Sequence, residues 1–171
     1  MSTRYSAMYL IAAALLIAAW GFAEDRQHKD RQHDHIIKTA DELQWKDGPP
    51  SLPSGVQYVV IEGDPTKEGS FTMRLKAPPN YRIPPHTHPQ VERVTVLQGT
   101  FRLGMGEQFD ESKMKSLPAG SFFVMPIGMT HFAATGDEEA IVQLNGHGPW
   151  DIRYVNPQDD PRNGSRAGSG R

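Results

Sequence analysis

Residues 86–99 read His-Thr-His-Pro-Gln-Val-Glu-Arg-Val-Thr-Val-Leu-Gln-Gly, a stretch that combines three possible metal ligands with a strand-forming run. His86 and His88 are two residues apart, so in an extended strand their imidazoles point to the same side. Glu92 follows at an even spacing and begins a β-branched run. Two imidazoles and a carboxylate on one side suit a divalent first-row transition metal. The stretch therefore predicts a metal site.

The chain after Val56 has the pattern of many short strands. In residues 70–76, apolar and polar side chains alternate, as expected for a half-buried strand. Turn residues interrupt such runs about every ten residues, which is typical of a sandwich or barrel. No helix of ordinary length fits after residue 47. Strands are expected at 57–62, 70–76, 92–98, 100–105, 121–125, 131–135, 140–146 and 150–155, with a polar loop at 106–116.

A second cluster, in residues 120–131, supplies turn residues and a fourth candidate ligand, His131. Together the two clusters resemble the motifs of the cupin family, G-x5-H-x-H-x3-4-E-x6-G and G-x5-P-x-G-x2-H-x3-N. The chain departs from them at Asn80 and Thr135, which stand where the family has glycine and asparagine. The matching residues are His86, His88, Glu92, Gly99, Gly120, Pro126, Gly128 and His131.

The resemblance implies an all-β fold, a single antiparallel jelly-roll barrel over residues 48–156. It also implies one divalent transition metal, with iron as the first candidate and manganese, nickel, copper or zinc as the others. The ion's two positive charges and one carboxylate leave a net positive site, which favours an anionic ligand. The implied metal ligands are His86, His88, Glu92 and His131.

Three functions are compatible with such a site. The first is a dioxygenase-like oxidoreductase for a small anionic or enolisable molecule, with Glu92 as the catalytic residue that accepts a proton. The second is a non-redox isomerase, lyase or decarboxylase, in which the metal acts as a Lewis acid. The third is a non-enzymatic periplasmic module that binds a ligand or metal. The resemblance also implies a homodimer, whereas the absence of a basic stripe excludes a nucleic-acid partner.

Residues 1–23 have the features of a secretory signal peptide. Arg4 precedes an uncharged apolar stretch, and Ala23 ends a small-residue cleavage site. We expect a periplasmic or secreted protein with no stable membrane insertion after cleavage; the alternative is an uncleaved anchor. The chain has no cysteine, so disulfides and a cysteine nucleophile are excluded.

Residues 24–47 predict a polar arm that ends in a short helical turn. The turn is expected because Thr39 and Glu42 have the spacing of a capping box. Three histidines of the arm either gather a metal loosely or belong to a solvated linker. They are His28, His33 and His35.

Residues 157–171 have almost no apolar side chains and predict a disordered tail. Gln143 and Tyr154 are further candidates for the cavity, and His147 lies in a turn outside both motifs. Four apolar residues near the second motif are expected in the core, and two methionines are expected either there or in the cavity. These are Phe122, Phe123, Met125 and Phe132, and Met105 and Met129.

Overall fold

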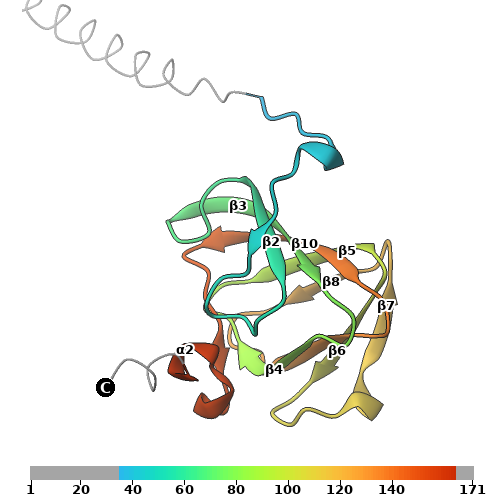
Figure 1. The fold of residues 1–171 in the computed structure, drawn as a ribbon. Helices are drawn as coiled ribbons and strands as arrows, with labels where there is room; N and C mark the ends of the chain where they lie inside the picture. Colours follow the sequence, from blue (N-terminus) through green and yellow to red (C-terminus); the bar gives the residue numbers. More distant parts are fainter. Residues whose placement is uncertain (1–34, 165–171) are drawn as a thin grey trace, which may run out of the picture. The chain divides into compact units, whose positions relative to one another are not determined.

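The computed structural model describes residues 35–164, which form two antiparallel sheets (Figure 1). The six-stranded sheet has the order β1-β2-β3-β10-β5-β8, and the five-stranded sheet has the order β11-β4-β9-β6-β7. This arrangement confirms the expected all-β jelly roll. The strands of the first sheet are β1 (Lys46–Asp47), β2 (Gln57–Glu62), β3 (Gly69–Ala77), β10 (Ala140–Gly148), β5 (Glu92–Gln98) and β8 (Phe122–Met125). Those of the second are β11 (Arg153–Tyr154), β4 (Arg82–Thr87), β9 (His131–Thr135), β6 (Thr100–Met105) and β7 (Lys115–Pro118). The helical turns are η1 (Ala40–Glu42), η2 (Glu111–Lys113), η3 (Pro157–Asp159) and α2 (Pro161–Gly164).

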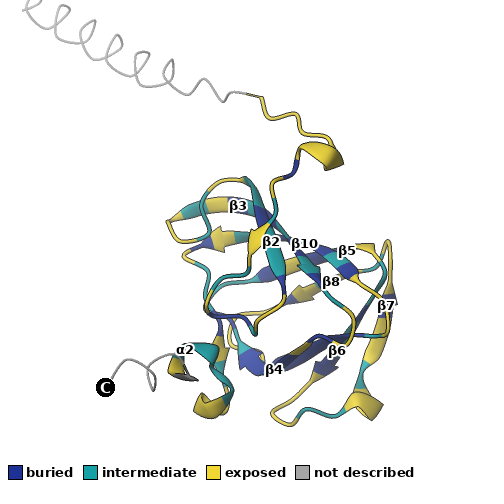
Figure 2. Cartoon of the chain, in the orientation of Figure 1, coloured by how far each residue is buried: buried dark blue, intermediate teal, exposed yellow. Residues whose placement is uncertain are grey.

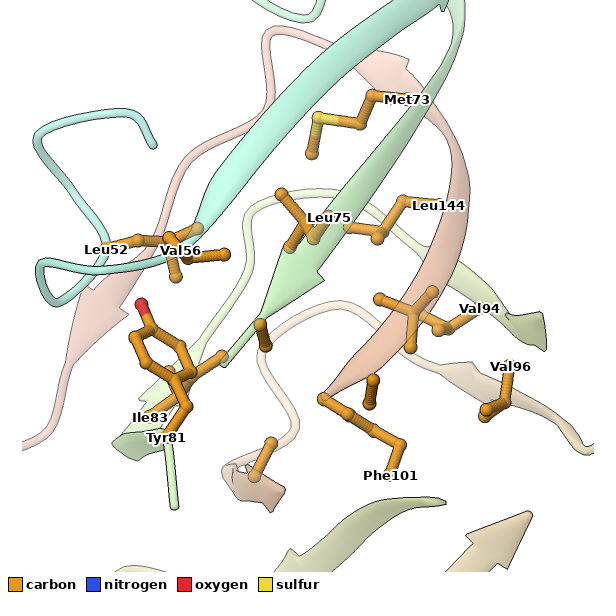
Figure 3. Close-up of a cluster of buried hydrophobic side chains, with 14 of the residues drawn as sticks. Leu52, Val56, Met73, Leu75, Tyr81, Ile83, Val94, Val96, Phe101 and Leu144 are labelled. Atoms are coloured by element: carbon orange, nitrogen blue, oxygen red, sulfur yellow. The ribbon is translucent and has the colours of Figure 1, made fainter. Parts of the chain in front are cut away.

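The hydrophobic core is built from the alternating side chains of the strands. On β3, Met73 and Leu75 are buried, whereas the residues beside them are only partly buried (Figure 2). Figure 3 shows both side chains in one cluster with Val94 from β5 and Leu144 from β10. Complete burial of side chains of this size stabilises the fold by about 1.5–3 kcal/mol each. The period-2 pattern of the sequence therefore marks the face that points into the barrel.

Most strands lie where the sequence predicts them. The strands expected at 57–62, 92–98, 100–105 and 131–135 have those bounds in the structure. The expected loop 106–116 is different, because it contains η2 and the start of β7. β7 buries only Leu117, so it carries no alternating signal. β11 has only two residues instead of the six expected at 150–155.

Asn80 and Thr135, which differ from the family motifs, both fit the turn before β4. Asn80 has a positive φ of 58°, which asparagine tolerates better than most residues. Its N–H donates to the carbonyl of Gly136. The Thr135 hydroxyl accepts from the N–H of Tyr81 at 2.9 Å and donates to the carbonyl of Pro78 at 2.6 Å. Both substitutions therefore satisfy polar groups of this turn.

The segment after β11 differs from the expectation of a tail that is disordered from residue 157. Residues 157–164 form η3 and α2. The Arg162 guanidinium donates to both carboxylate oxygens of Asp160 at 2.8 Å and to the carbonyl of Ile152 at 2.8 Å. Hydrogen bonds, rather than apolar burial, fix this segment, which explains why composition did not reveal it. Residues 165–171 lie outside the described residues.

One aromatic residue expected in the core is exposed. Phe122 is 58% exposed on β8, at the edge of the six-stranded sheet. Phe123 packs against the core cluster and Met125 is buried, as expected for both. Phe132 is completely buried, as expected.

The N-terminal predictions are only partly within the described residues. The signal peptide of residues 1–23 and two arm histidines, His28 and His33, lie outside them. His35 is exposed. The capped turn is present as η1, where the Glu42 carboxylate accepts the N–H of Thr39 at 2.7 Å. Within residues 35–164, no helix has the length and apolar character needed to cross a bilayer.

Candidate metal centre

The four side chains proposed as ligands come together from both sheets. His86 lies on β4 directly opposite His131 on β9. His88 follows the end of β4, and Glu92 begins β5 in the other sheet. All four residues are at least 94% buried, with Glu92 the most exposed at 6%. Side chains from three strands of a rigid framework therefore meet in the barrel.

An irregularity in β4 turns the two histidines of the first motif inward. Ile83, His86 and His88 all line the cavity, although strict alternation would place Ile83 on the face opposite the histidines. The register of β4 against β9 shifts between Ile83 and His86. Pro84 and Pro85 occupy this place, and proline cannot donate to the ladder. A bulge at the two prolines therefore reverses the alternation.

The backbone holds each imidazole in one tautomer. Nδ1 of His86 lies 2.7 Å from the carbonyl oxygen of Pro84, Nδ1 of His88 lies 2.8 Å from that of Asp151, and Nδ1 of His131 lies 3.1 Å from that of Met129. A carbonyl can only accept, so each Nδ1 carries the proton. Nε2 is then an unprotonated donor atom for a metal, and the carbonyl fixes the ring orientation.

The free nitrogen atoms of the three histidines converge within the range of one small ion, and the Glu92 carboxylate lies beside two of them. The ligand atoms of the three histidines lie within 4.8 Å of one another. The Glu92 carboxylate oxygens lie 3.6 Å from Nε2 of His88 and 3.9 Å from Nε2 of His131. Nε2 of His88 has no hydrogen-bond partner among the described residues. An unpaired buried nitrogen costs free energy, and a metal ion at the centre would remove that cost.

Burial shifts the pKa values of these four groups toward their neutral forms. It lowers the pKa of His88 to about 4 and raises that of Glu92 to about 7. It also lowers the pKa of His86 and of His131; His86 is affected further by the neighbouring imidazoles, whereas Glu92 offsets part of the shift of His131. The imidazoles are therefore neutral at physiological pH, as metal ligands must be.

A family model described as the ChrR cupin-like domain matches residues 32–151. The chain belongs to the ChrR cupin-like family. The membership of the cupin superfamily expected from the two motifs is therefore confirmed, and the second motif has a clear structural role. Gly128, with a positive φ of 71°, donates its N–H to the carbonyl of His88 at 3.0 Å. The two motifs of this cupin thus support each other across the site.

Curated relatives of this cupin include germin-like proteins of Oryza sativa subsp. japonica. Germin-like protein 8-11 is 31% identical over 137 residues, which are 75% of this chain and 61% of that protein. Germin-like protein 5-1 is 41% identical over 76 residues, which are 43% of this chain and 34% of that protein. The chain thus spans 61% or less of the length of these relatives.

Solved structures support the same fold. The polyketide cyclase RemF from Streptomyces resistomycificus superposes with a TM-score of 0.63 at 16% identity, over 77% of this chain and 93% of that one. An oxalate oxidase superposes with a TM-score of 0.50 at 23% identity, over 74% of this chain and 67% of that one. At such identities the likeness is one of fold.

The cavity of this cupin is small, with about 30 Å³ available to the centres of water-sized molecules. Its polar lining consists of the four proposed ligands and Trp150. Trp150 was not singled out from the sequence, because it lies outside both motifs. Its indole stacks on the His88 imidazole, with ring centres 5.1 Å apart and planes at 21°. The remaining lining residues are apolar: Leu52, Leu75, Ile83, Val94, Phe101, Leu103, Phe123, Ala133, Val142, Leu144 and Ile152.

The other candidates from the sequence do not line this cavity. Gln143 accepts a hydrogen bond from Arg74 on the outer face of the sheet. The Tyr154 hydroxyl donates to the carbonyl of Ser51 at 2.8 Å. Both methionines are exposed, Met105 by 48% and Met129 by 43%. His147 is also exposed.

Proposed function

We propose that this protein is a mononuclear metal-dependent oxidoreductase, dioxygenase-like, that acts on a small anionic or enolisable molecule. In this proposal His86, His88, Glu92 and His131 hold one divalent transition metal, iron first among the candidates. The observation that carries the proposal is the convergence of three histidine side chains, with the Glu92 carboxylate beside two of them, in an otherwise apolar cavity. The ion, when bound, would supply Lewis acidity and electron transfer to the reaction.

The chain itself supplies orientation, exclusion of water and one proton acceptor. The carbonyls of Pro84, Asp151 and Met129 keep each imidazole in the orientation that a ligand needs. The apolar walls exclude bulk water, which strengthens electrostatic interactions inside. Among residues 35–164, Glu92 is the only carboxylate in the cavity lining, and its raised pKa of about 7 suits a group that accepts and returns a proton near neutral pH.

The charge of the site supports an anionic substrate. Three neutral imidazoles and one carboxylate leave a bound divalent ion with one uncompensated positive charge. No lysine or arginine of the described part of the chain lines the cavity, so an anion would be held mainly at the ion itself. A small carboxylate or enolate fits this chemistry, because either one presents an anionic oxygen.

Metal analysis of the full chain, purified without added metal, tests the proposal. We expect about one transition-metal ion per chain in the wild type and less than a tenth of that in His88→Ala, because a missing imidazole removes one of the proposed ligands. His147→Ala is the matched control, since His147 is exposed and lies outside the cavity. Full metal content in His88→Ala would contradict the ligand assignment.

An oxygen electrode then separates redox chemistry from other reactions. Oxygen uptake with small dicarboxylates or diketones, absent in His88→Ala, would support the oxidoreductase. Metal-dependent turnover that continues without oxygen would instead indicate an isomerase, lyase or decarboxylase. Bound metal with no turnover of either kind would indicate a binding module.

A further inference from the structure

One buried polar atom of the cavity has no hydrogen-bond partner in the backbone and is not a proposed metal ligand. Nε1 of Trp150 is closed off from solvent and has no hydrogen-bond partner among the described residues. The other such atom, Nε2 of His88, is a proposed metal ligand. A buried N–H without an acceptor is rare in folded proteins and calls for an explanation. An acceptor that binds in the cavity provides one.

The indole of Trp150 lines the cavity beside a proposed metal ligand. It lies nearly parallel to the His88 imidazole, which lines the same cavity. Burial raises the pKa of Glu92, and both His131 and the indole N–H offset part of that rise. The N–H therefore interacts with the Glu92 carboxylate, but not with the distance and angle of a normal hydrogen bond. This position is next to the proposed ion.

The backbone around Trp150 is fixed before any ligand binds. The Trp150 N–H of the main chain donates to the carbonyl of Pro65 at 2.7 Å. The carbonyl of Asp151 accepts from His88, and the carbonyl of Ile152 accepts from Arg162 at 2.8 Å. A donor that is already oriented loses little entropy when it binds its acceptor. The indole is thus a preorganised donor.

We propose that Trp150 donates its indole N–H to an anionic oxygen of the small molecule that binds at this site, such as a small carboxylate or an enolate. The inference rests on the proposed function, because the metal is the other anchor of the anion. All other lining groups are ligands or apolar. Trp150 therefore makes the single directed hydrogen bond from the protein to the substrate and selects ligands with an acceptor at that place.

Titration of the full-length, cobalt(II)-loaded protein with oxalate and acetate tests this role. The cobalt absorption spectrum reports the metal site, and calorimetry reports the affinity for the anion. In Trp150→Phe we expect about ten- to hundred-fold weaker binding of oxalate, because a hydrogen bond to a charged group is lost. The spectrum without anion stays unchanged, since phenylalanine still stacks on His88. Trp45→Phe, away from the cavity, is the matched control.

A second variant, Trp150→His, keeps a ring N–H and should recover part of the lost affinity. It also covers the case in which phenylalanine disturbs the fold. Unchanged affinity for both anions in Trp150→Phe would overturn the inference. So would weaker cobalt binding with unchanged anion affinity, because the indole would then act on Glu92. Failure of the wild type to bind cobalt would overturn the proposed function, and the inference with it.

Discussion

The same strands form the polar part of the barrel interior and the apolar part beside it. Burial has opposite effects on the folding free energy in these two parts. On β5, Glu92 lines the metal centre, whereas Val94 and Val96, the next inward side chains, belong to the core cluster. On β9, His131 and Ala133 divide in the same way. The apolar part gains free energy from burial alone. The polar part loses free energy until an ion compensates its desolvated groups.

This difference shows that stability and function are separated along each strand. The apolar part should set the free energy of unfolding, and the polar part should set metal and pH dependence. Substitutions in one part should therefore leave the property of the other unchanged.

Truncation in the apolar part should affect stability without affecting the metal. Met73 is 2% exposed and does not line the metal cavity, and Met73→Ala should lower the free energy of unfolding by about 2–5 kcal/mol through lost burial and a cavity. Denaturant unfolding measures the loss, and elemental analysis should find unchanged metal content. Leu97→Ala, at a site that is 41% exposed, should cost far less. Loss of metal in Met73→Ala would refute the separation.

Without metal, the Glu92→Gln variant should become more stable relative to the wild type as the pH rises. The raised pKa of Glu92, about 7 against 4.5, means that its contribution to stability is complete below pH 4.5. This contribution is lost as the pH rises through 7. Glu92→Gln does not titrate, so its stability relative to wild type should rise by about 3 kcal/mol between pH 4.5 and 8. Urea unfolding with a chelator, at several pH values, measures this difference; a pH-independent difference would contradict the shift.

Metal affinity should depend on pH through Glu92 first and through the imidazoles only in stronger acid. Between pH 7 and about 4, one proton on Glu92 competes with the ion, so affinity should fall about tenfold per pH unit. Below pH 4 the fall should steepen, because His88 has a pKa of about 4. Competition with a fluorescent chelator measures the slope. A fall in affinity of more than tenfold per pH unit that already starts at pH 6.5 would instead show imidazoles with ordinary pKa values.

The smallest effect is expected at the C-terminal turn. Arg162 donates to the carbonyl of Ile152 and to the carboxylate of Asp151 at 3.0 Å, which fixes the segment beside Trp150. Arg162→Ala should lower stability by only about 1 kcal/mol, because the ion pairs are partly exposed. Hydrogen exchange should nevertheless increase at residues 150–154. Arg162→Lys, which lacks the planar fork, should restore little of the protection, and unchanged exchange in Arg162→Ala would refute this role.

The residue types and spacings of the two motifs were sufficient to predict the fold class and the group of four side chains that meet. Period-2 alternation identified the inward faces of strands such as β3, because one face of each strand must be buried. The spacing of His86, His88 and Glu92 indicated a shared side, and His131 came from the second motif. These are local patterns, and local sequence encodes them.

Long-range contacts decided the rest. Alternation from Ile83 would have turned the histidines of the first motif outward, and only the register shift against β9, at two prolines, turns them inward. Trp150 enters the cavity because its backbone bonds to Pro65, which is far from it in the sequence. Arg162 orders a segment that composition marked as disordered. Each of these depends on a partner distant along the chain, and a distant partner leaves no periodic signal in the sequence.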